Sequence, residues 1–178
     1  MRLLSLIFII LLFNGSILAQ QNSFSFTQNG LSAFVKEDFQ HINKKLLFQL
    51  TLEWLRLPSQ KNKIHIVSTK ENQLICLEDI KFKILCDKYL EDLNCYDVKS
   101  TIEISFFETS YTITVVKMEI YIPSENKWVN FSLKPDQKNK YFKKNGTIHT
   151  RYIMYPSTIS SIFNSFNENL KKYIVNSM

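Results

Sequence analysis

Residues 101–121 have the sequence TIEISFFETSYTITVVKMEIY, and this stretch decides the fold class. In its first half, apolar residues alternate with polar ones, as in an antiparallel strand that is buried on one face only. Residues 108–110 can turn the chain into a second strand over 111–121. The apolar positions of the second strand change parity at Val115 and Val116, and a β-bulge there would return them to one face. The alternating apolar residues of the first strand are Ile102, Ile104 and Phe106.

Two earlier stretches show the same period of two. Residues 64–68 alternate around Ile64 and Ile66, so His65 is expected on the outer face of a strand. Residues 80–86 alternate as well, and together these stretches predict a meander of four antiparallel strands that ends at residue 121. The expected inward residues of 80–86 are Ile80, Phe82, Ile84 and Cys86.

A helix is expected between Asn43, which can cap its N-terminus, and Leu57, because Pro58 stops it. One apolar stripe with helical spacing runs along this helix and includes Trp54. The full stripe is Leu46, Leu47, Leu50, Trp54 and Leu57.

The same helix carries a second apolar stripe, Phe48, Leu52 and Leu55, on nearly the opposite face. A helix at the surface of a domain needs only one such stripe. Either the helix is sandwiched between the sheet and another segment, or the second stripe is an interaction face for a partner.

A C-terminal helix is expected after Pro156, where apolar residues return at helical spacing as far as Ile174. Residues 22–39 are expected to be extended with a turn at 29–30, and residues 128–133 to form a short strand. The predicted class is α+β: an antiparallel sheet of about four to six strands. The Trp-bearing helix and the C-terminal helix are expected to pack on one face of that sheet.

The N-terminus has the order of a secretory signal peptide. Arg2 is followed by an apolar run and then by small residues up to Ala19. The run is shorter than the about 20 apolar residues that a membrane-spanning helix needs. We expect cleavage between Ala19 and Gln20, which leaves residues 20–178 as one domain in the periplasm or outside the cell, without a transmembrane segment.

The composition indicates a folded chain, and the net charge indicates which kinds of partner it favours. Hydrophobic residues make up 45% of the 178 residues and charged residues 21%, which argues against disorder. The formal net charge is +6. In an exported protein this excess favours anionic lipid or polysaccharide over nucleic acid as a partner.

Part of the positive charge is concentrated in one basic loop, which surrounds Tyr141 and Phe142 and precedes a turn signal at Asn145 and Gly146. One interpretation is a solvated loop. The other is a site for an anionic lipid or glycan surface. The lysines of this loop are Lys134, Lys138, Lys140, Lys143 and Lys144.

Three cysteines are present, so outside the cell at least one thiol is unpaired or pairs between chains. Cys86 and Cys95 flank a polar stretch and are the candidates for a disulfide. Cys76 lies in an apolar run and is expected to be a small core residue.

We predict no catalytic residue, no metal site and no cofactor. His41, His65 and His149 have no ligand spacing, and there is no Gly-x-Ser-x-Gly motif. The acidic residues between strands are typical of solvated turns, whereas a glycosidase needs two carboxylates about 5–10 Å apart across a cleft.

Three motifs, GLSAFV at 30–35, LTLEWL at 50–55 and TIEISF at 101–106 followed by YTITV at 111–115, occur in this order. With them the chain resembles a family of secreted Bacteroidota proteins, domain of unknown function 4468, whose fold is like that of the TATA-binding protein. The likeness covers residues 30–121, and residues 122–178 add the basic loop and the C-terminal helix. The resemblance implies a sheet with helices on one face. It implies no DNA binding, because a fold does not transmit function.

These observations favour an exported, non-catalytic envelope domain that binds an unknown envelope protein or other ligand. An anionic surface binder acting through the basic loop is the second hypothesis. An exported hydrolase is the third.

Overall fold

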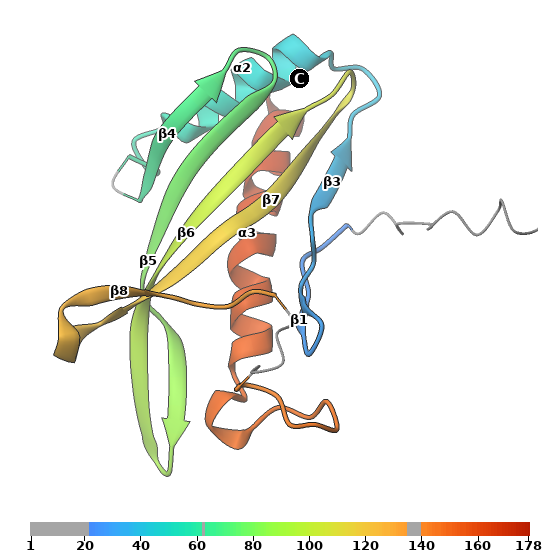
Figure 1. Cartoon of the computed structure of the whole chain (residues 1–178). Coiled ribbons are helices and arrows are strands. Elements are labelled where there is room, and N and C mark those ends of the chain that lie inside the picture. Colours follow the sequence, from blue (N-terminus) through green and yellow to red (C-terminus); the bar gives the residue numbers. More distant parts are fainter. Residues whose placement is uncertain (1–21, 62, 135–139) are drawn as a thin grey trace, which may run out of the picture.

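The computed structural model describes residues 22–61, 63–134 and 140–178. A six-stranded antiparallel sheet has the order β3-β7-β6-β5-β4, with β8 also paired to β7, and β1 and β2 form a separate ribbon. Figure 1 shows both helices, α2 and α3, on one face of the large sheet. The predicted α+β class is therefore confirmed. The elements are β1 (Phe26–Thr27), β2 (Gly30–Leu31), β3 (Val35–Asp38), α2 (Lys44–Leu55), β4 (Ile64–Lys70), β5 (Leu74–Tyr89), β6 (Asp92–Phe106), β7 (Ser110–Ile122), the 3-10 turn η1 (Pro123–Glu125), β8 (Lys127–Asn130), the 3-10 turn η2 (Thr150–Tyr152) and α3 (Tyr155–Asn176).

The meander consists of β4 to β7, and its predicted bulge is present. Thr101 of β6 pairs with Lys117, whereas the next residue, Ile102, pairs with Val115. Val116 is therefore the extra residue on β7. The bulge keeps the apolar residues before and after it on the face that packs against the helices.

Of the predicted inward set of residues 80–86, Cys86 is buried, and the other three positions are wrong. Leu85 is fully buried, whereas Phe82 and Ile84 are exposed and Ile80 is half-buried. The strand does not begin at Ile80: β5 starts at Leu74, and Ile75 and Leu77 set its inward parity. The pairing of β5 with β6 is irregular between Lys81 and Leu85, where three consecutive residues are exposed. Odd-numbered residues face the core on both sides of this irregularity, up to Asp79 and again at Leu85 and Asp87.

Helix α2 begins where the sequence predicts, because the Asn43 Oδ1 accepts a hydrogen bond from the Leu46 backbone nitrogen at 2.9 Å. It ends at Leu55, three residues before Pro58. Helix α3 buries its predicted stripe, of which only Tyr173 is half-buried. The two helices meet through Trp54 and Phe166, whose rings are 5.2 Å apart.

The first described residues pack as extended segments. Gly30, the second residue of the predicted turn, has a φ of 88°, and β1 and β2 pair on either side of this turn. Serine and asparagine side chains of α3 hold the β1 segment: Ser160 Oγ accepts from the Phe26 nitrogen at 3.0 Å, and Asn164 bonds both backbone groups of Phe24. Among the described residues, no helix is long and apolar enough to cross a membrane. The predicted signal peptide, with Ala19 and Gln20, lies outside these residues.

Candidate functional site: a groove where the sheet edge is interrupted

The second apolar stripe of α2 lies in the core. Phe48 and Leu55 are buried, and the Phe48 ring packs edge-on against Phe106 of β6 at 5.4 Å. Leu52 is half-buried against the same core. The prediction that these three residues form an interaction face is therefore wrong. The alternative holds, because α2 contacts α3 as well as the sheet.

The aromatic residues of the basic loop also belong to the core. Tyr141 is buried and stacks on Phe131, with ring centres 4.7 Å apart. Phe142 forms an isolated β-bridge with Ile148 and packs against Phe26. These rings therefore anchor the loop and are not presented to a ligand.

The lysines of the basic loop do not form one described patch. Lys138 lies outside the described residues. Lys140 lies over the Tyr141 ring, with its Nζ 5.4 Å from the ring centre. Lys143 closes a turn with Thr147, and Lys144 follows it in the same turn. Lys134 alone lines the groove described below.

Cys86 and Cys95 are joined by a disulfide across the β5–β6 hairpin, where they are direct cross-strand partners. Cys76 is unpaired and half-buried on the sheet face that points away from the helices, so its predicted place in the core is wrong. Burial and the nearby carboxylates of Glu103 and Glu78 raise the pKa of the Cys76 thiol. A raised pKa disfavours the thiolate, which makes this cysteine a poor nucleophile.

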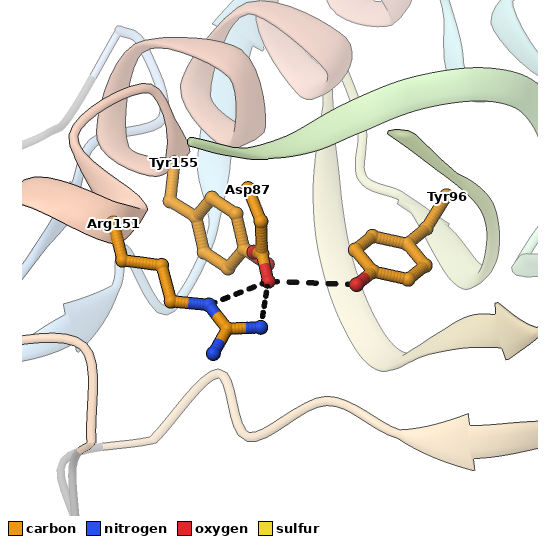
Figure 2. A network of polar contacts seen from close by, with 4 residues as sticks. All are labelled: Asp87, Tyr96, Arg151 and Tyr155. Carbon is orange, nitrogen blue, oxygen red and sulfur yellow. Dashed lines mark hydrogen bonds and ion pairs between the residues drawn. The ribbon is translucent and has the colours of Figure 1, made fainter. Parts of the chain in front are cut away.

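A buried carboxylate, Asp87, organises a polar network at the free end of the β5–β6 hairpin. Figure 2 shows its carboxylate between Arg151 and the phenols of Tyr155 and Tyr96. Arg151 donates from Nε at 2.9 Å and from Nη2 at 2.7 Å, Tyr155 donates a short hydrogen bond, and Tyr96 donates at 3.4 Å. Burial first, and then the negative charge of Asp87, raise the pKa of the Tyr155 phenol.

This network is a structural anchor. The hydrogen bonds and the charge of Arg151 satisfy the carboxylate, and its contacts in the described part of the chain are with a guanidinium and two phenols. Arg151 and Tyr155 come from η2 and from the start of α3. The contacts therefore fix the hairpin to the N-terminal end of that helix. The sequence prediction missed this cluster.

Two further carboxylates lie on the inner face of the sheet. Glu37 of β3 pairs with Lys171 at 2.6 Å and accepts from Asn167 at 2.8 Å, which ties the opposite edge of the sheet to α3. Asp79 of β5 is only 1% exposed and pairs with Lys81 at 2.9 Å, and its Oδ1 has no hydrogen-bond partner among the described residues. Burial, opposed by Lys81, raises the pKa of Asp79.

The candidate binding site lies where the outer edge of β7 is interrupted. On this edge β3 pairs with residues 110–113 of β7, and β8 pairs with residues 119–122. No strand of the described part of the chain pairs with residues 114–118 on that side. Two backbone hydrogen bonds frame the interruption: Phe131 donates to the Met118 carbonyl at 2.8 Å, and Leu31 donates to the Leu133 carbonyl at 2.8 Å.

The interruption forms a groove with a volume of about 630 Å³. Its lining is mainly apolar, and the two charged residues in it, Lys117 and Lys134, are both basic. This volume lies in the range of small-molecule sites, which are typically apolar with a few polar groups. The bulge residue Val116 projects here and is 53% exposed. The lining is Leu31, Ser32, Ala33, Thr114, Val115, Val116, Lys117, Met118, Asn130, Phe131, Ser132, Leu133 and Lys134.

The charge next to the groove remains positive in spite of one nearby acid. Glu119 pairs with Lys117 at 2.8 Å and with Lys99 at 3.1 Å. Burial pushes the pKa of Glu119 upward, but the two lysines outweigh burial and lower it. One ionised carboxylate thus faces two cations, and Lys134 adds a third. The surroundings of the groove favour an anionic group on a ligand.

The described residues contain no candidate metal site. No group of three or more histidine, cysteine, aspartate or glutamate side chains in the described ranges could hold a metal ion. His65 lies exposed on the outer side of β4 opposite Glu78, as its alternation predicts.

A scan against protein-family models and a search of curated proteins give no match for this sequence. Among solved structures, a DUF4468 family protein from Bacteroides ovatus is similar with a TM-score of 0.65 at 11% identity, over 82% of this chain and 86% of that chain. A TBP-like protein from Parabacteroides distasonis has a TM-score of 0.53 at 13% identity, over 80% of this chain and 91% of that chain. The predicted resemblance is confirmed as a fold: the chain has the TBP-like fold of the DUF4468 proteins. Both solved proteins are named for their fold class and not for an activity.

Proposed function

We propose that this chain is an exported, non-catalytic binding module of the cell envelope, and that its site is the groove beside residues 114–118 of β7. The observation that carries the proposal is the interrupted sheet edge. The outer edge of β7 is paired at both ends, and the unpaired part between them coincides with a cavity that has mainly apolar walls and two lysines. A groove of this kind suits a ligand with an apolar body and an anionic group.

The signal-like N-terminus supports export, since charged, apolar and small residues follow one another in the order of a signal peptide. N-terminal sequencing of the protein recovered from the cell envelope tests this part. We expect the mature chain to begin at Gln20. A protein that retains Met1 and stays in the cytoplasm would contradict it.

The anionic amphiphile 8-anilinonaphthalene-1-sulfonate is a suitable probe of the groove, because it combines an aromatic body with a sulfonate. We expect saturable fluorescence enhancement with the folded protein. Val116→Trp fills the groove and should abolish binding. Reversing both groove lysines, Lys117→Glu with Lys134→Glu, should weaken binding about tenfold at low salt, since each exposed charge contact contributes up to about 1 kcal/mol.

Matched controls come from α3. Val175 is 51% exposed, close to the exposure of Val116, and Lys172 is exposed as well. Val175→Trp and Lys172→Glu should leave probe binding unchanged. If the groove variants bind the probe as well as the α3 variants do, the groove is not the site.

The second hypothesis, an anionic lipid or glycan surface, now depends on Lys134 together with Lys117, because the aromatic residues of the loop, Tyr141 and Phe142, pack against the core. Binding to anionic vesicles that falls with salt and is lost in the double lysine variant would support it. For the hydrolase hypothesis, no described pair of acid and base faces the groove.

A further inference from the structure

The β5–β6 hairpin extends beyond the rest of the sheet. On one side β4 pairs with β5 only as far as Asp79, and on the other side β7 pairs with β6 only from Val98 onward. Residues 80–97 therefore form a two-stranded ribbon that projects past the sheet, as Figure 1 shows for the green hairpin. An isolated two-stranded ribbon is marginally stable by itself.

This ribbon is unusually well fixed for a projecting element. The Cys86–Cys95 disulfide links its two strands. The Asp87 network bonds it to Arg151 and Tyr155 next to α3. Two independent constraints therefore hold the tip in one position, which lowers the entropy that docking would cost.

The tip exposes large apolar side chains, and its charged residues are Glu91, Asp92 and one lysine, Lys88. Leu90 is 80% exposed, and Tyr89 and Leu93 are more than half exposed. Leu90 also has a φ of 56°, in a two-residue turn where the first central residue is usually glycine. Leucine is therefore unfavourable at this position for two reasons: its apolar side chain is exposed to water, and its backbone has a positive φ. An unfavourable residue held at an exposed tip is a candidate for a contact with another molecule.

We propose that the hairpin tip docks into the groove of a second copy of this chain. This inference rests on the proposed function, because it uses the groove as a binding site and names its ligand. The two surfaces are complementary: the tip carries Glu91 and Asp92 among its apolar residues, and the groove carries Lys117 and Lys134 among its own. Opposite charges set the orientation while the apolar contacts provide the affinity.

Tip and groove are different surfaces of one molecule, so the contact is heterologous. Repeating such a contact gives a ring if the rotation closes and an open chain if it does not. The two carboxylates at the tip argue against insertion into a lipid bilayer, where charged groups are costly.

The test uses two variants that each remove one half of the contact. Leu90→Asn with Leu93→Ser removes both exposed leucines of the tip, and asparagine tolerates the positive φ. Val116→Trp blocks the groove. By light scattering after gel filtration, we expect the mass of the wild-type protein to rise with concentration and each variant to stay monomeric. The Val175→Trp control should assemble as the wild type does.

Mixing the two variants tests whether the tip of one copy binds the groove of another. The tip variant keeps an intact groove and the groove variant keeps an intact tip, so one contact can form and a 1:1 dimer is expected. Wild-type protein that stays monomeric up to about 1 mM would overturn the proposal, since the contact would then contribute less than about 4 kcal/mol. Probe binding in the groove without assembly would leave the proposed function intact.

Two other outcomes would also overturn the self-association. A mixture that stays monomeric although the wild type assembles would show a different interface. Monomeric protein that sediments with phosphatidylglycerol vesicles, but not after the tip substitutions, would assign the tip to a membrane surface. Circular dichroism of each variant establishes that it is folded before these comparisons are made.

Discussion

Replacing Asp87 with alanine should destabilise the whole domain and loosen the β5–β6 hairpin. The carboxylate accepts hydrogen bonds from three side chains, those of Arg151, Tyr155 and Tyr96. All three lose their acceptor in Asp87→Ala. The three losses differ in size, because the donors differ in how easily they return to water.

The largest loss comes from the Tyr155 phenol, since Tyr155 is buried and an unsatisfied buried donor costs about 1–3 kcal/mol. The side chain of Arg151 is 51% exposed and can be solvated again, so its contribution is about 1 kcal/mol or less. The Tyr96 bond is long, at 3.4 Å, and adds little. We therefore expect a loss of about 3 kcal/mol in the free energy of unfolding, near the lower end of the effect of breaking a buried pair.

Urea denaturation measures this loss, and hydrogen exchange of residues 82–97 measures the local loosening. Asp87→Asn keeps an acceptor for the phenol and should cost less than Asp87→Ala. Glu125→Ala removes an exposed ion pair with Lys127 and should cost less than about 1 kcal/mol. The reasoning is refuted if Asp87→Ala costs no more than Glu125→Ala, or if exchange in the hairpin is unchanged.

Two other substitutions test single residues. Asp79→Asn should be at least as stable as the wild type at pH 7, because burial outweighs Lys81 and raises the pKa of the Asp79 carboxyl in the folded protein. The stability that this carboxyl contributes is present below its unfolded pKa of about 3.9, and it is lost as the pH rises through the folded pKa. Melting temperatures between pH 4 and 8 should accordingly fall less with pH in the variant, and an unchanged slope would show that Asp79 is well solvated. Leu90→Gly should raise the free energy of unfolding in urea by about 1 kcal/mol by relieving a positive φ, whereas Leu46→Gly in α2 should lower it by about the same amount; a loss at position 90 would show that the turn is unstrained.

Several local features of the fold follow from the sequence because their causes are local. The apolar positions of β7 change from odd to even numbers within a few residues, and this change predicts the bulge at Val116. The Asn43 cap marks the start of α2, and Pro58 limits its end. The stripe of α3 has a strict helical spacing and is buried as predicted. Each of these depends on residues of one helix or one strand, so no partner strand is needed to infer them.

The face of β5 could not be inferred in this way. Its apolar residues at 80, 82 and 84 have a clear period of two, but they project away from the core. Partner strands decide the register, and β5 pairs with β6 from Leu74 onward. The odd-numbered inward positions include Asp79 and Asp87, which the core tolerates because Lys81 and Arg151 compensate their charge. These two aspartates make the inward face of β5 look polar in the sequence, so the alternation of apolar residues indicates the wrong face.

The groove and the Asp87 network were missed for the same reason. The groove is bounded by residues near 31, 116 and 132, and the network joins residues 87 and 151, so both depend on contacts over long sequence separations. Lys134 belongs to the basic loop that the sequence predicts, and it lines the groove. Lys117 was overlooked, because in the sequence it is one polar residue of an alternating strand.

Helix α3 is the element that holds the groove and the hairpin tip in a fixed relation. At its N-terminal end Tyr155 bonds Asp87 and thereby positions the hairpin. Within the next three turns Ser160 and Asn164 bond the backbone of the β1 segment, whose partner strand β2 supplies Leu31 to the groove wall. Both proposed contact surfaces are thus bonded to the same helix, from different sides of it. A repeating head-to-tail contact needs a constant angle between its two surfaces, and a shared helix provides it.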